Sequence, residues 1–236
     1  MPTTHRIPVT DDEATVAVHH AAPTDDWIVF CHGFLSDKSG SYEGRCERAV
    51  SEGYNAVRFD FRGCGEADGA FVDQTLSDKL ADLRAVVDHV DPDSYALFGS
   101  SFGGKVAFHA TAPDDRVTAL ATRAPVTANS AFDHARAAVE RAGAYEYDTG
   151  DRVDERFFAD FDDYPFDAVV GKIEVPVAIF HGATDDSVPI EDSFAAAERL
   201  QTDVLFQKFA GEGHRFSRPA EARLRTQLFD WLAVVD

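Results

Sequence analysis

The stretch YALFGSSFGGKVAFHATA, residues 95–112, is the most informative part of this sequence. Its first five residues, Tyr95–Gly99, form an apolar run that is typical of a strand buried on both faces of a sheet. The run leads into GSSFG at positions 99–103, and a helical pattern follows. A strand that turns sharply into a helix at G-x-S-x-G leaves the middle serine strained, with its hydroxyl exposed. The stretch therefore predicts an α/β protein with a reactive serine.

Two adjacent serines compete for the reactive position. Only Ser101 has one glycine two residues before it and another two residues after it, so Ser101 is the predicted nucleophile and Ser100 is expected to point away from the cleft. Glycine suits the flanking positions because a side chain there would collide with neighbouring backbone. The helix that begins at Phe102 aims its N-terminal N–H groups at any anion formed beside the serine.

Apolar runs and helical periodicity alternate on both sides of this stretch. Strands are predicted at residues 6–9, 15–20, 27–31, 56–61, 95–99, 117–124, 175–180 and 204–209. Helices are predicted at residues 41–52, 76–90, 102–112, 192–200 and 220–234. Strands separated by helices favour a mostly parallel central sheet with helices on both faces.

Residues 126–172 break this alternation. The segment is rich in Ala, Asp, Phe and Tyr, lacks a central buried strand run and is too long for an ordinary loop. It predicts a small helical cap above the sheet, with residues 1–125 and 173–236 forming the core. Most aromatic residues of the cap are expected to seal it against the core, and a few to line an apolar acyl pocket over Ser101. They are Phe132, Tyr145, Tyr147, Phe157, Phe158, Phe161, Tyr164 and Phe166.

Two further motifs follow predicted strands. HGATDDSVP occupies positions 181–189, and GEGH occupies positions 211–214. A carboxylate just past a strand end lies at the carboxyl edge of the sheet, where ligands bind in open α/β folds. It can accept a hydrogen bond from a histidine and so orient that histidine as the base for a serine. Asp185 and Asp186 both qualify on chemistry, and His214 is the predicted base. Serine, acid and histidine follow one another in the order typical of α/β-hydrolases.

The motif Cys31-His32-Gly33-Phe34 closes the first long buried strand. A glycine there lets the chain bend across the top of the sheet, and we assign the oxyanion hole to the backbone N–H groups of Phe34 and Phe102. His32 is expected to bond to nearby loop backbone rather than to take part in catalysis.

Together these motifs resemble the α/β-hydrolase superfamily. The resemblance rests on HGF at 32–34, DFRGCG at 60–65, GSSFG at 99–103, the H-G-x-x-D-x-x-V-P pattern at 181–189 and GH at 213–214, and it covers residues 27–231. Within the superfamily the chain is most similar to the small acyl-esterase and serine-aminopeptidase-like group, which includes short cinnamoyl and feruloyl esterases. The resemblance implies that Asp185 rather than Asp186 is the acid, and that the cap lies between the sixth and seventh strands. Ala67 departs from the group, which usually has serine there, and this bears on the packing of the loop.

The expected activity is hydrolysis of small or medium carboxylic esters through an acyl-enzyme on Ser101, with no metal and no organic cofactor. Peptidase and thioesterase activities stay open because they use the same acyl-enzyme chemistry. Acyl transfer or perhydrolysis depends on the exclusion of water. A non-catalytic binding protein on the same fold is a further alternative, although such proteins usually lose a member of the triad.

The charge of the chain is strongly acidic, with 42 acidic residues against 22 basic ones and a net charge of −20. Such a chain is not expected to bind nucleic acid or an anionic membrane through its overall field. The acid is spread along the whole chain and Lys is sparse, which indicates adaptation to high salt in an extreme halophile, where screening reduces self-repulsion. A solvated acidic surface without such adaptation is the alternative.

Cysteine usage and the N-terminus bear on the compartment. The three cysteines, Cys31, Cys46 and Cys64, form no C-x-x-C pair, so neither a disulfide framework nor a zinc site is expected. Residues 1–10 lack an apolar h-region, and the sequence has no apolar stretch of 18 residues. The prediction is a cytoplasmic protein with free thiols whose partner is a small-molecule ester.

Overall fold

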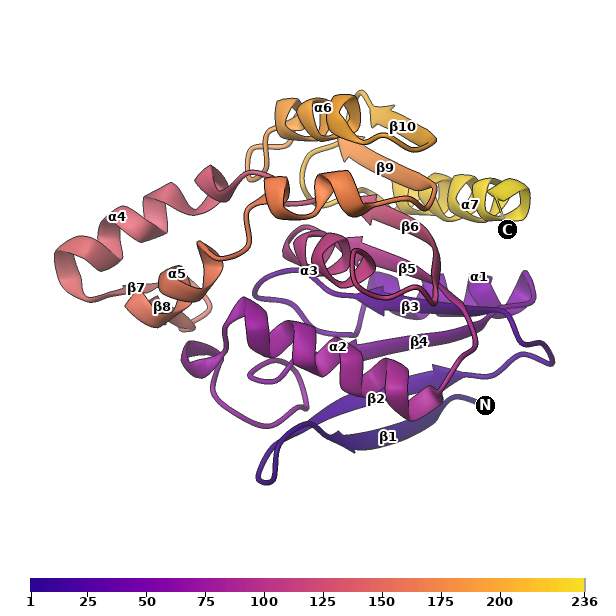
Figure 1. Ribbon diagram of the computed structural model, residues 1–236, viewed down its shortest axis with the longest axis horizontal. Helices are drawn as coiled ribbons and strands as arrows, with labels where there is room; N and C mark the ends of the chain where they lie inside the picture. Colours follow the sequence, from indigo (N-terminus) through magenta and orange to yellow (C-terminus); the bar gives the residue numbers. More distant parts are fainter. Residues whose placement is uncertain (236) are drawn as a thin grey trace.

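The computed structural model describes residues 1–235, and a single mixed sheet runs through them (Figure 1). Among these residues, eight strands follow the order β1-β2-β4-β3-β5-β6-β9-β10. β2 pairs antiparallel with β1 and β4, and the other pairs are parallel. The bounds are β1 Thr3–Pro8, β2 Ala14–His20, β3 Trp27–Cys31, β4 Asn55–Asp60, β5 Tyr95–Ser100, β6 Val117–Arg123, β9 Val177–Gly182 and β10 Val204–Phe209. The predicted fold class is confirmed.

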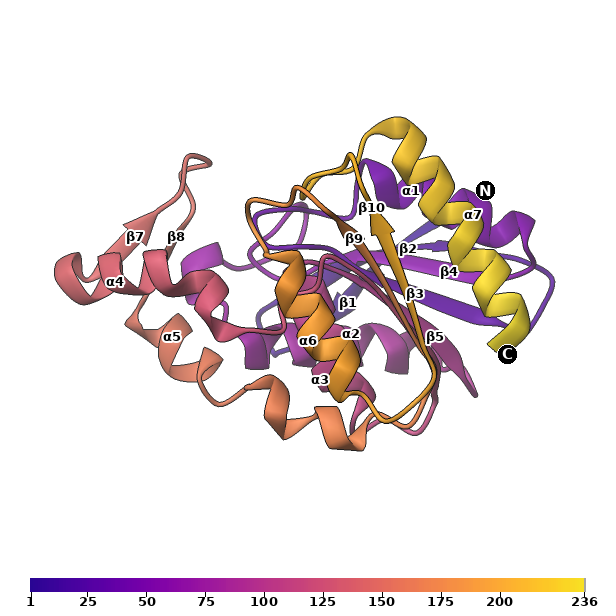
Figure 2. The ribbon, with the colours of Figure 1, turned by 90° about the horizontal axis from the view of Figure 1, so that it is seen from above.

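Helices cover both faces of this sheet (Figures 1 and 2). One face carries α1 Ser41–Ser51 and α7 Arg218–Val235, and the other carries α2 Leu76–Val90, α3 Phe102–Thr111 and α6 Ile190–Arg199. A separate apolar core lies on each side of the sheet, so the central strands are largely buried on both faces. The interior strands therefore read as continuous apolar runs rather than alternating patterns.

Local signals in the sequence set the ends of α2. Thr75 and Asp78 form a capping box, in which the Thr75 side chain accepts from the Asp78 N–H and the Asp78 side chain accepts from the Thr75 N–H. At the other end Asp91 takes a left-handed conformation, and Pro92 follows it. A proline there cannot continue the helix. The apolar periodicity and these end signals together explain why the predicted bounds of this helix agree with the observed ones.

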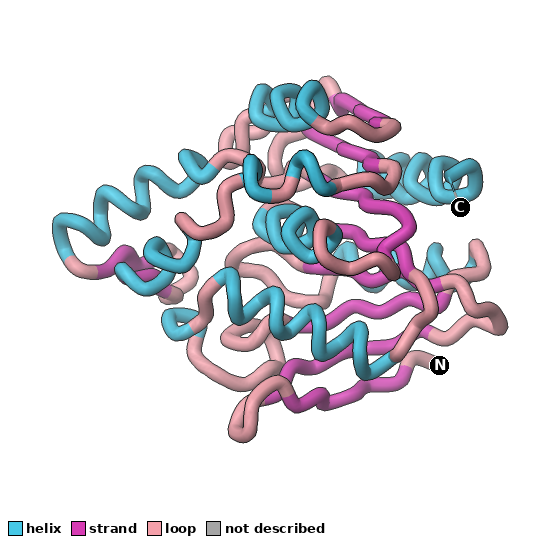
Figure 3. Tube along the Cα trace, in the orientation of Figure 1, coloured by secondary structure: helices cyan, strands magenta, loops and turns pink. Residues whose placement is uncertain are grey.

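The first part of residues 126–172, up to about residue 161, extends beyond one end of the sheet, and the remainder returns beside α3 and α6 (Figures 2 and 3). Residues 126–172 contain the helices α4 Asp133–Ala142 and α5 Glu155–Phe161, with short 3-10 turns at Asn129–Phe132, Phe166–Ala168 and Val170–Lys172. They also contain the antiparallel hairpin of β7 Ala144–Glu146 and β8 Arg152–Asp154. This hairpin was not predicted, because strands of three residues are too short to produce a periodic pattern. We refer to residues 126–172 as the cap segment.

Among residues 1–235, no helix is long and apolar enough to cross a membrane. The three cysteines are free, with Cys31 and Cys46 buried and Cys64 half-buried. Burial raises the pKa of the Cys64 thiol to about 11, so the protonated form dominates at neutral pH.

Candidate active site

Ser101 lies on a sharp turn between β5 and α3. Its backbone has φ 53° and ψ −118°, a conformation that costs a residue with a side chain about 1–3 kcal/mol. A Cβ at Gly99 would overlap the carbonyl group of Gly103, and a Cβ at Gly103 would overlap the carbonyl oxygen of His32. Both flanking positions therefore require glycine, and the strained turn exposes the serine side chain as the motif predicts.

The two adjacent serines point in different directions. Ser100 is fully buried, and its Oγ accepts a hydrogen bond from Arg45 Nη1 at 3.2 Å. Ser101 is half-buried, and its Oγ lies 3.0 Å from His214 Nε2. The structure therefore brings Ser101, and not Ser100, to the predicted base.

His214 joins Ser101 to Asp185. Its Nδ1 lies 2.8 Å from Asp185 Oδ2. Since an ionised carboxylate only accepts, Nδ1 carries the proton and Nε2 is left to accept the hydroxyl proton of Ser101. This is the tautomer that a general base requires. Three residues that lie far apart in sequence thus form one continuous hydrogen-bonded chain.

The two loops that carry the acid and the histidine are locked to each other. Thr184 N–H donates to the carbonyl oxygen of Glu212 at 3.0 Å, and a Cβ at Gly182 would overlap that same carbonyl group. The glycine of the H-G-x-x-D motif is therefore needed for close approach of the loop that follows β10. This contact fixes the position of Asp185 relative to His214.

Several donors converge on the Asp185 carboxylate. Its Oδ1 accepts from the N–H groups of Ser187 and Val188, each at 2.9 Å. Burial alone raises the pKa of Asp185, but hydrogen bonds from His181, His214 and the Val188 N–H outweigh it and hold that pKa far below its ordinary value. Asp185 is therefore ionised at neutral pH. Asp186 is exposed, with its Oδ1 accepting from Ser187 Oγ at 3.4 Å.

The sequence did not reveal a second histidine beside the acid. His181 is fully buried, and its Nε2 lies 3.2 Å from Asp185 Oδ2 and 3.0 Å from the Val188 carbonyl oxygen. Its Nδ1 lies 2.7 Å from Ser193 Oγ. With a proton on Nε2, His181 donates toward Asp185 and accepts from the serine hydroxyl. The four-residue spacing from His181 to Asp185 within one motif was the available signal.

The loop that follows β3 passes over Ser101. Cys31 pairs with Gly99, so residues 32–34 begin beside the end of β5. A Cβ at Gly33 would lie 3.3 Å from the Ser100 carbonyl oxygen and 3.4 Å from Ser101 Cβ. The rings of Phe34 and Phe102, the two predicted oxyanion-hole residues, lie 5.2 Å apart.

The contacts of His32 agree with its predicted bonding to loop backbone. Its Nδ1 lies 2.8 Å from the Gly33 carbonyl oxygen, and its Nε2 accepts from the Phe61 N–H at 3.0 Å. Burial lowers the pKa of His32 to about 4, so its ring is neutral at pH 7. Through these two hydrogen bonds the ring joins the end of β3 to the end of β4.

A buried ion pair holds the far end of the same loop. Lys38 donates to the fully buried Asp60 through both its backbone N–H, at 2.8 Å, and its Nζ, at 2.5 Å. The Glu66 N–H donates to the same carboxylate at 2.8 Å. Asp60 thus ties the loop beside Ser101 to the loop that contains Ala67.

A cavity of about 420 Å³ opens beside Ser101. Its lining combines the loop after β3 with the His214 loop and the start of α7, and most of the side chains are polar. The lining residues are Gly33, Phe34, Leu35, Ser36, Asp37, Ser39, Gly40, Ser41, Tyr42, Ser101, Arg123, His214, Arg215, Phe216 and Glu221. Sequence reasoning missed Arg123, although a charged residue at the carboxyl end of a buried strand was a usable signal.

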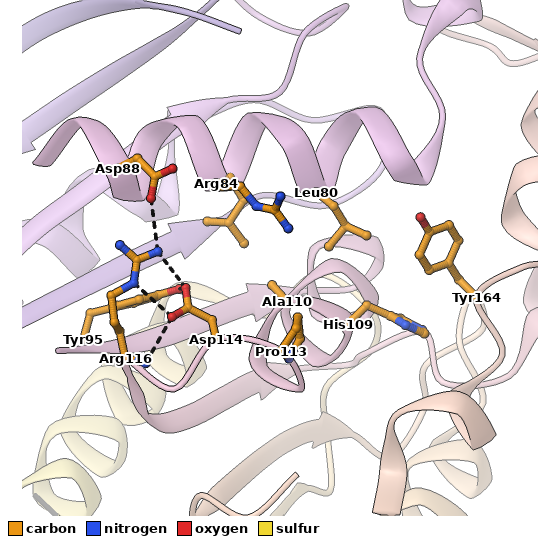
Figure 4. A pocket seen from close by; sticks show the side chains of 11 residues that line it. Leu80, Arg84, Asp88, Tyr95, His109, Ala110, Pro113, Asp114, Arg116 and Tyr164 are labelled. Carbon is orange, nitrogen blue, oxygen red and sulfur yellow. Dashed lines mark hydrogen bonds and ion pairs between the residues drawn. The ribbon is translucent and has the colours of Figure 1, made fainter. Parts of the chain in front are cut away.

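A second cavity of about 420 Å³ lies between α2 and α3 (Figure 4). At one end Arg116 Nη2 contacts Asp88 and Asp114, at 3.1 and 2.9 Å, and at the other end lie His109 and Tyr164. The described residues that line it come from α2, the start of β5, α3, the turn before β6 and the cap segment. Ser101, His214 and Asp185 are all absent from the lining of this second cavity, whereas Ser101 and His214 line the first. We therefore take the cavity beside Ser101 as the candidate site.

The cap aromatics that the sequence singled out are largely packed into the core. Phe157, Phe158, Phe161 and Phe166 are buried, and the rings of Phe157 and Phe161 stack at 5.4 Å. The ring of Phe132 contacts those of Phe34, Phe102, Phe157 and Phe161. These side chains hold the cap segment against the region around Ser101.

Within residues 1–235, no group of three or more His, Cys, Asp and Glu side chains is arranged to hold a metal ion.

Comparison with known proteins gives the family. The chain is 27% identical to the mitochondrial palmitoyl-protein thioesterase ABHD10 of Homo sapiens over 220 residues, which cover 86% of this chain and 71% of that protein. A putative hydrolase from Agrobacterium vitis S4 superposes with a TM-score of 0.83 at 25% identity, over 100% of this chain and 99% of the other. Est1E from Butyrivibrio proteoclasticus, solved with ferulic acid, superposes with a TM-score of 0.88 at 20% identity, over 98% of each chain.

The family model itself covers more than half of the sequence. It describes the alpha/beta hydrolase fold and matches residues 26–159, from the start of β3 into α5. The matched part includes the turn at Ser101 and the loop after β3, and the structure adds the loops of Asp185 and His214. The chain belongs to the alpha/beta hydrolase family.

Proposed function

We propose that this hydrolase cleaves small or medium carboxylic esters through an acyl-enzyme formed on Ser101. The observation that carries the proposal is the continuous chain from Asp185 Oδ2 to His214 Nδ1 at 2.8 Å and from His214 Nε2 to Ser101 Oγ at 3.0 Å. Nucleophile, base and orienting acid are within hydrogen-bonding distance without any rearrangement, which is the geometry that serine catalysis needs.

In the proposed reaction, His214 takes the Ser101 proton as Oγ attacks the ester carbonyl carbon. The ionised Asp185 stabilises the imidazolium that forms and keeps the ring in its productive orientation. His214 then gives its proton to the departing alcohol. Water, activated by the same histidine, attacks the acyl-enzyme and releases the carboxylic acid.

The developing oxyanion is assigned to the backbone N–H groups of Phe34 and Phe102. The Phe102 N–H belongs to the first turn of α3, where N–H groups have no partner within the helix and the helix dipole favours negative charge. The close approach of Gly33 to Ser101 supports placing the Phe34 N–H on the side of the oxyanion opposite the Phe102 N–H. Two such donors stabilise the transition state more than the planar ester.

The size of the substrate is inferred from the packing around Ser101. Phe157 and Phe161 of α5 are at most 2% exposed, and their rings pack against Phe102 beside Ser101, so this side of the nucleophile offers little room for a long acyl chain. The cavity beside Ser101 has about 420 Å³ and a largely polar lining. Both features favour short or medium esters.

Thioester hydrolysis is the second candidate. It is favoured by the 27% identity to the palmitoyl-protein thioesterase ABHD10 across 86% of this chain. A thioester would use the same acyl-enzyme, with a thiol leaving in place of an alcohol. Release of the thiol needs less help from His214, since thiols are more acidic than alcohols.

The test measures hydrolysis of 4-nitrophenyl esters of graded acyl length and of the matching acyl thioesters. Wild type, Ser101→Ala and Ser100→Ala are compared, with labelling of each by a serine-directed fluorophosphonate. Turnover and labelling that are lost in Ser101→Ala and kept in Ser100→Ala support the proposal. Equal loss in both variants, or turnover that survives in Ser101→Ala, would overturn the assignment of the nucleophile. A preference for long-chain thioesters over short esters would make the thioesterase reading the better one.

A further inference from the structure

The cavity beside Ser101 contains a guanidinium group that the proposed mechanism does not use. Arg123 is the last residue of β6 and lies opposite Ser100 in the register of β5. Its carbonyl oxygen accepts the Ser101 N–H at 2.8 Å, so its backbone is fixed directly beside the nucleophile. Its side chain lines the same cavity as Ser101 and His214.

The charge of Arg123 is poorly compensated. Glu221 is the nearest carboxylate, but both of its oxygens accept from Arg45 Nη2, at 2.8 and 3.0 Å. Arg123 Nη1 lies 3.6 Å from Glu221 Oε1, beyond hydrogen-bonding distance. Arg45 is itself fully buried, so one carboxylate serves two guanidinium groups in a region of low dielectric.

Two further observations mark the same deficit. Arg123 is only 13% exposed, and its Nε is buried without a hydrogen-bond partner among residues 1–235. Burial and then the neighbouring Arg45 lower the pKa of Arg123, which means that its surroundings disfavour the bare cation. A buried polar group left unpaired costs free energy that a suitable ligand can recover.

The other charged groups of the cavity do not supply the missing anion. Asp37 also lines the cavity, but its Oδ1 accepts from the Ser39 N–H at 2.7 Å and so closes a turn of its own loop. Arg215 lies exposed at the rim and adds a second positive charge. The Arg123 guanidinium carbon lies 5.5 Å from the centre of the Phe216 ring, which helps to hold its orientation.

We propose that Arg123 binds a carboxylate of the substrate, so that the preferred esters carry a negative charge in the part that occupies this cavity. A planar guanidinium matches a carboxylate with two parallel hydrogen bonds and gives geometric specificity as well as charge. The inference deepens the proposed ester hydrolysis and rests on it. It also runs against the overall field, because a chain of net charge −20 repels anionic substrates in general.

The first experiment compares substrates that differ only in the charged group. The first pair is mono-4-nitrophenyl glutarate, which carries a carboxylate on its acyl chain, and the neutral 4-nitrophenyl pentanoate. The second pair is butyrylglycolate, which carries a carboxylate on its alcohol part, and the neutral ethyl butyrate. We expect wild type to prefer the anionic member of one pair by roughly tenfold or more in kcat/KM, as a charge-assisted hydrogen bond implies.

Variants then assign the preference to Arg123. Arg123→Met should remove the preference, and Arg123→Lys should keep part of it, because lysine retains the charge without the planar fork. Arg199→Met is the matched control, since it removes the same charge from α6, where Arg199 contacts Asp167 outside this cavity. Equal rates on both members of both pairs in wild type would overturn the proposal while leaving ester hydrolysis intact.

A binding measurement separates the two proposals. Titration calorimetry of Ser101→Ala with glutarate, and with neutral glutaramide at the same KCl concentration, does not depend on turnover. Glutarate binding that weakens by about tenfold or more when Arg123→Met is added supports the carboxylate site, even if no ester tested is hydrolysed. Glutarate that binds no better than glutaramide, or equally well without Arg123, refutes it.

Discussion

At the scale of single residues, the difference between Asp185 and Asp186 shows how position decides chemistry. Both are aspartates in the loop that follows β9, yet Asp185 Oδ2 faces His214 and its Oδ1 accepts from two backbone N–H groups. Asp186 is exposed to solvent. The carboxylate with converging donors has the depressed pKa and stays ionised.

This difference gives the first prediction. Asp185→Asn should lower kcat by about 10³–10⁴-fold, because an amide in that place favours the wrong histidine tautomer. Asp186→Asn makes the same chemical change on the neighbouring residue and should keep kcat within about twofold, since its side chain is solvated. Steady-state kinetics on the best ester from the graded series measures both. The opposite ranking would mean that Asp186 is the acid.

At the scale of elements, the turn from β5 into α3 depends on the absence of a side chain at Gly99. We predict that Gly99→Ala destabilises the protein by about 2 kcal/mol or more and abolishes labelling of Ser101, because the new Cβ would collide with the backbone of Gly103. Gly171→Ala is the matched control, since a Cβ there meets no atom within 4 Å. Denaturant unfolding and fluorophosphonate labelling measure the two effects. Equal stabilities of the two variants would show that the turn can relax.

The joint between α3 and the cap segment contains a buried lysine. Lys105 is only 2% exposed, and its Nζ donates to Asn129 Oδ1 at 2.8 Å and to the Tyr164 carbonyl oxygen. Burial lowers the pKa of Lys105 to about 8, against an ordinary value of 10.5. Between these two values the unfolded chain binds more protons than the folded one. Stability contributed at this site therefore rises with pH in that window.

The prediction is a pH-dependent difference between wild type and Lys105→Met. Relative to the variant, wild type should gain up to about 3 kcal/mol of unfolding free energy as the pH rises from 7 to 10.5. Denaturant unfolding at each pH measures it, with Lys172→Met as the control for loss of one lysine from an exposed position. A difference that stays constant with pH would mean that Lys105 keeps its ordinary pKa in the folded protein.

Features encoded in a short stretch of sequence could be predicted, whereas features that need contacts between distant residues could not. Ser101, Asp185 and His214 each follow a strand within a short motif, so both the strands and the order of the three residues could be read directly. The cluster of Arg45, Arg123 and Glu221 could not, because it exists only after α1 and α7 pack on the same face of the sheet. The cap hairpin was missed for a related reason, since its strands are stabilised by tertiary contacts rather than by pattern.

At the scale of the whole molecule, the acidic residues outnumber the basic residues that could pair with them. The chain carries a net charge of −20, and its ion pairs use part of the acidic residues, as at Arg136 with Asp162 and Arg116 with Asp114. Many exposed carboxylates therefore repel one another over the surface. In dilute buffer the Debye length is about 30 Å, comparable to the size of a small domain, whereas at 1 M salt it is about 3 Å. Self-repulsion should thus dominate at low salt and vanish at molar salt.

This leads to the last prediction, which also tests the proposed halophilic origin. The melting temperature and kcat/KM for a neutral ester should rise as KCl is raised from about 0.01 M to molar levels, most steeply where screening changes most. Sucrose, at concentrations that stabilise by exclusion alone, controls for effects unrelated to charge. Since lowering the pH also removes negative charge, stability in dilute buffer should rise between pH 8 and 6 by less than KCl achieves, because most carboxylates stay ionised there. A melting temperature that does not change with KCl would show that the acidic surface is merely solvated, and the halophilic interpretation would fall.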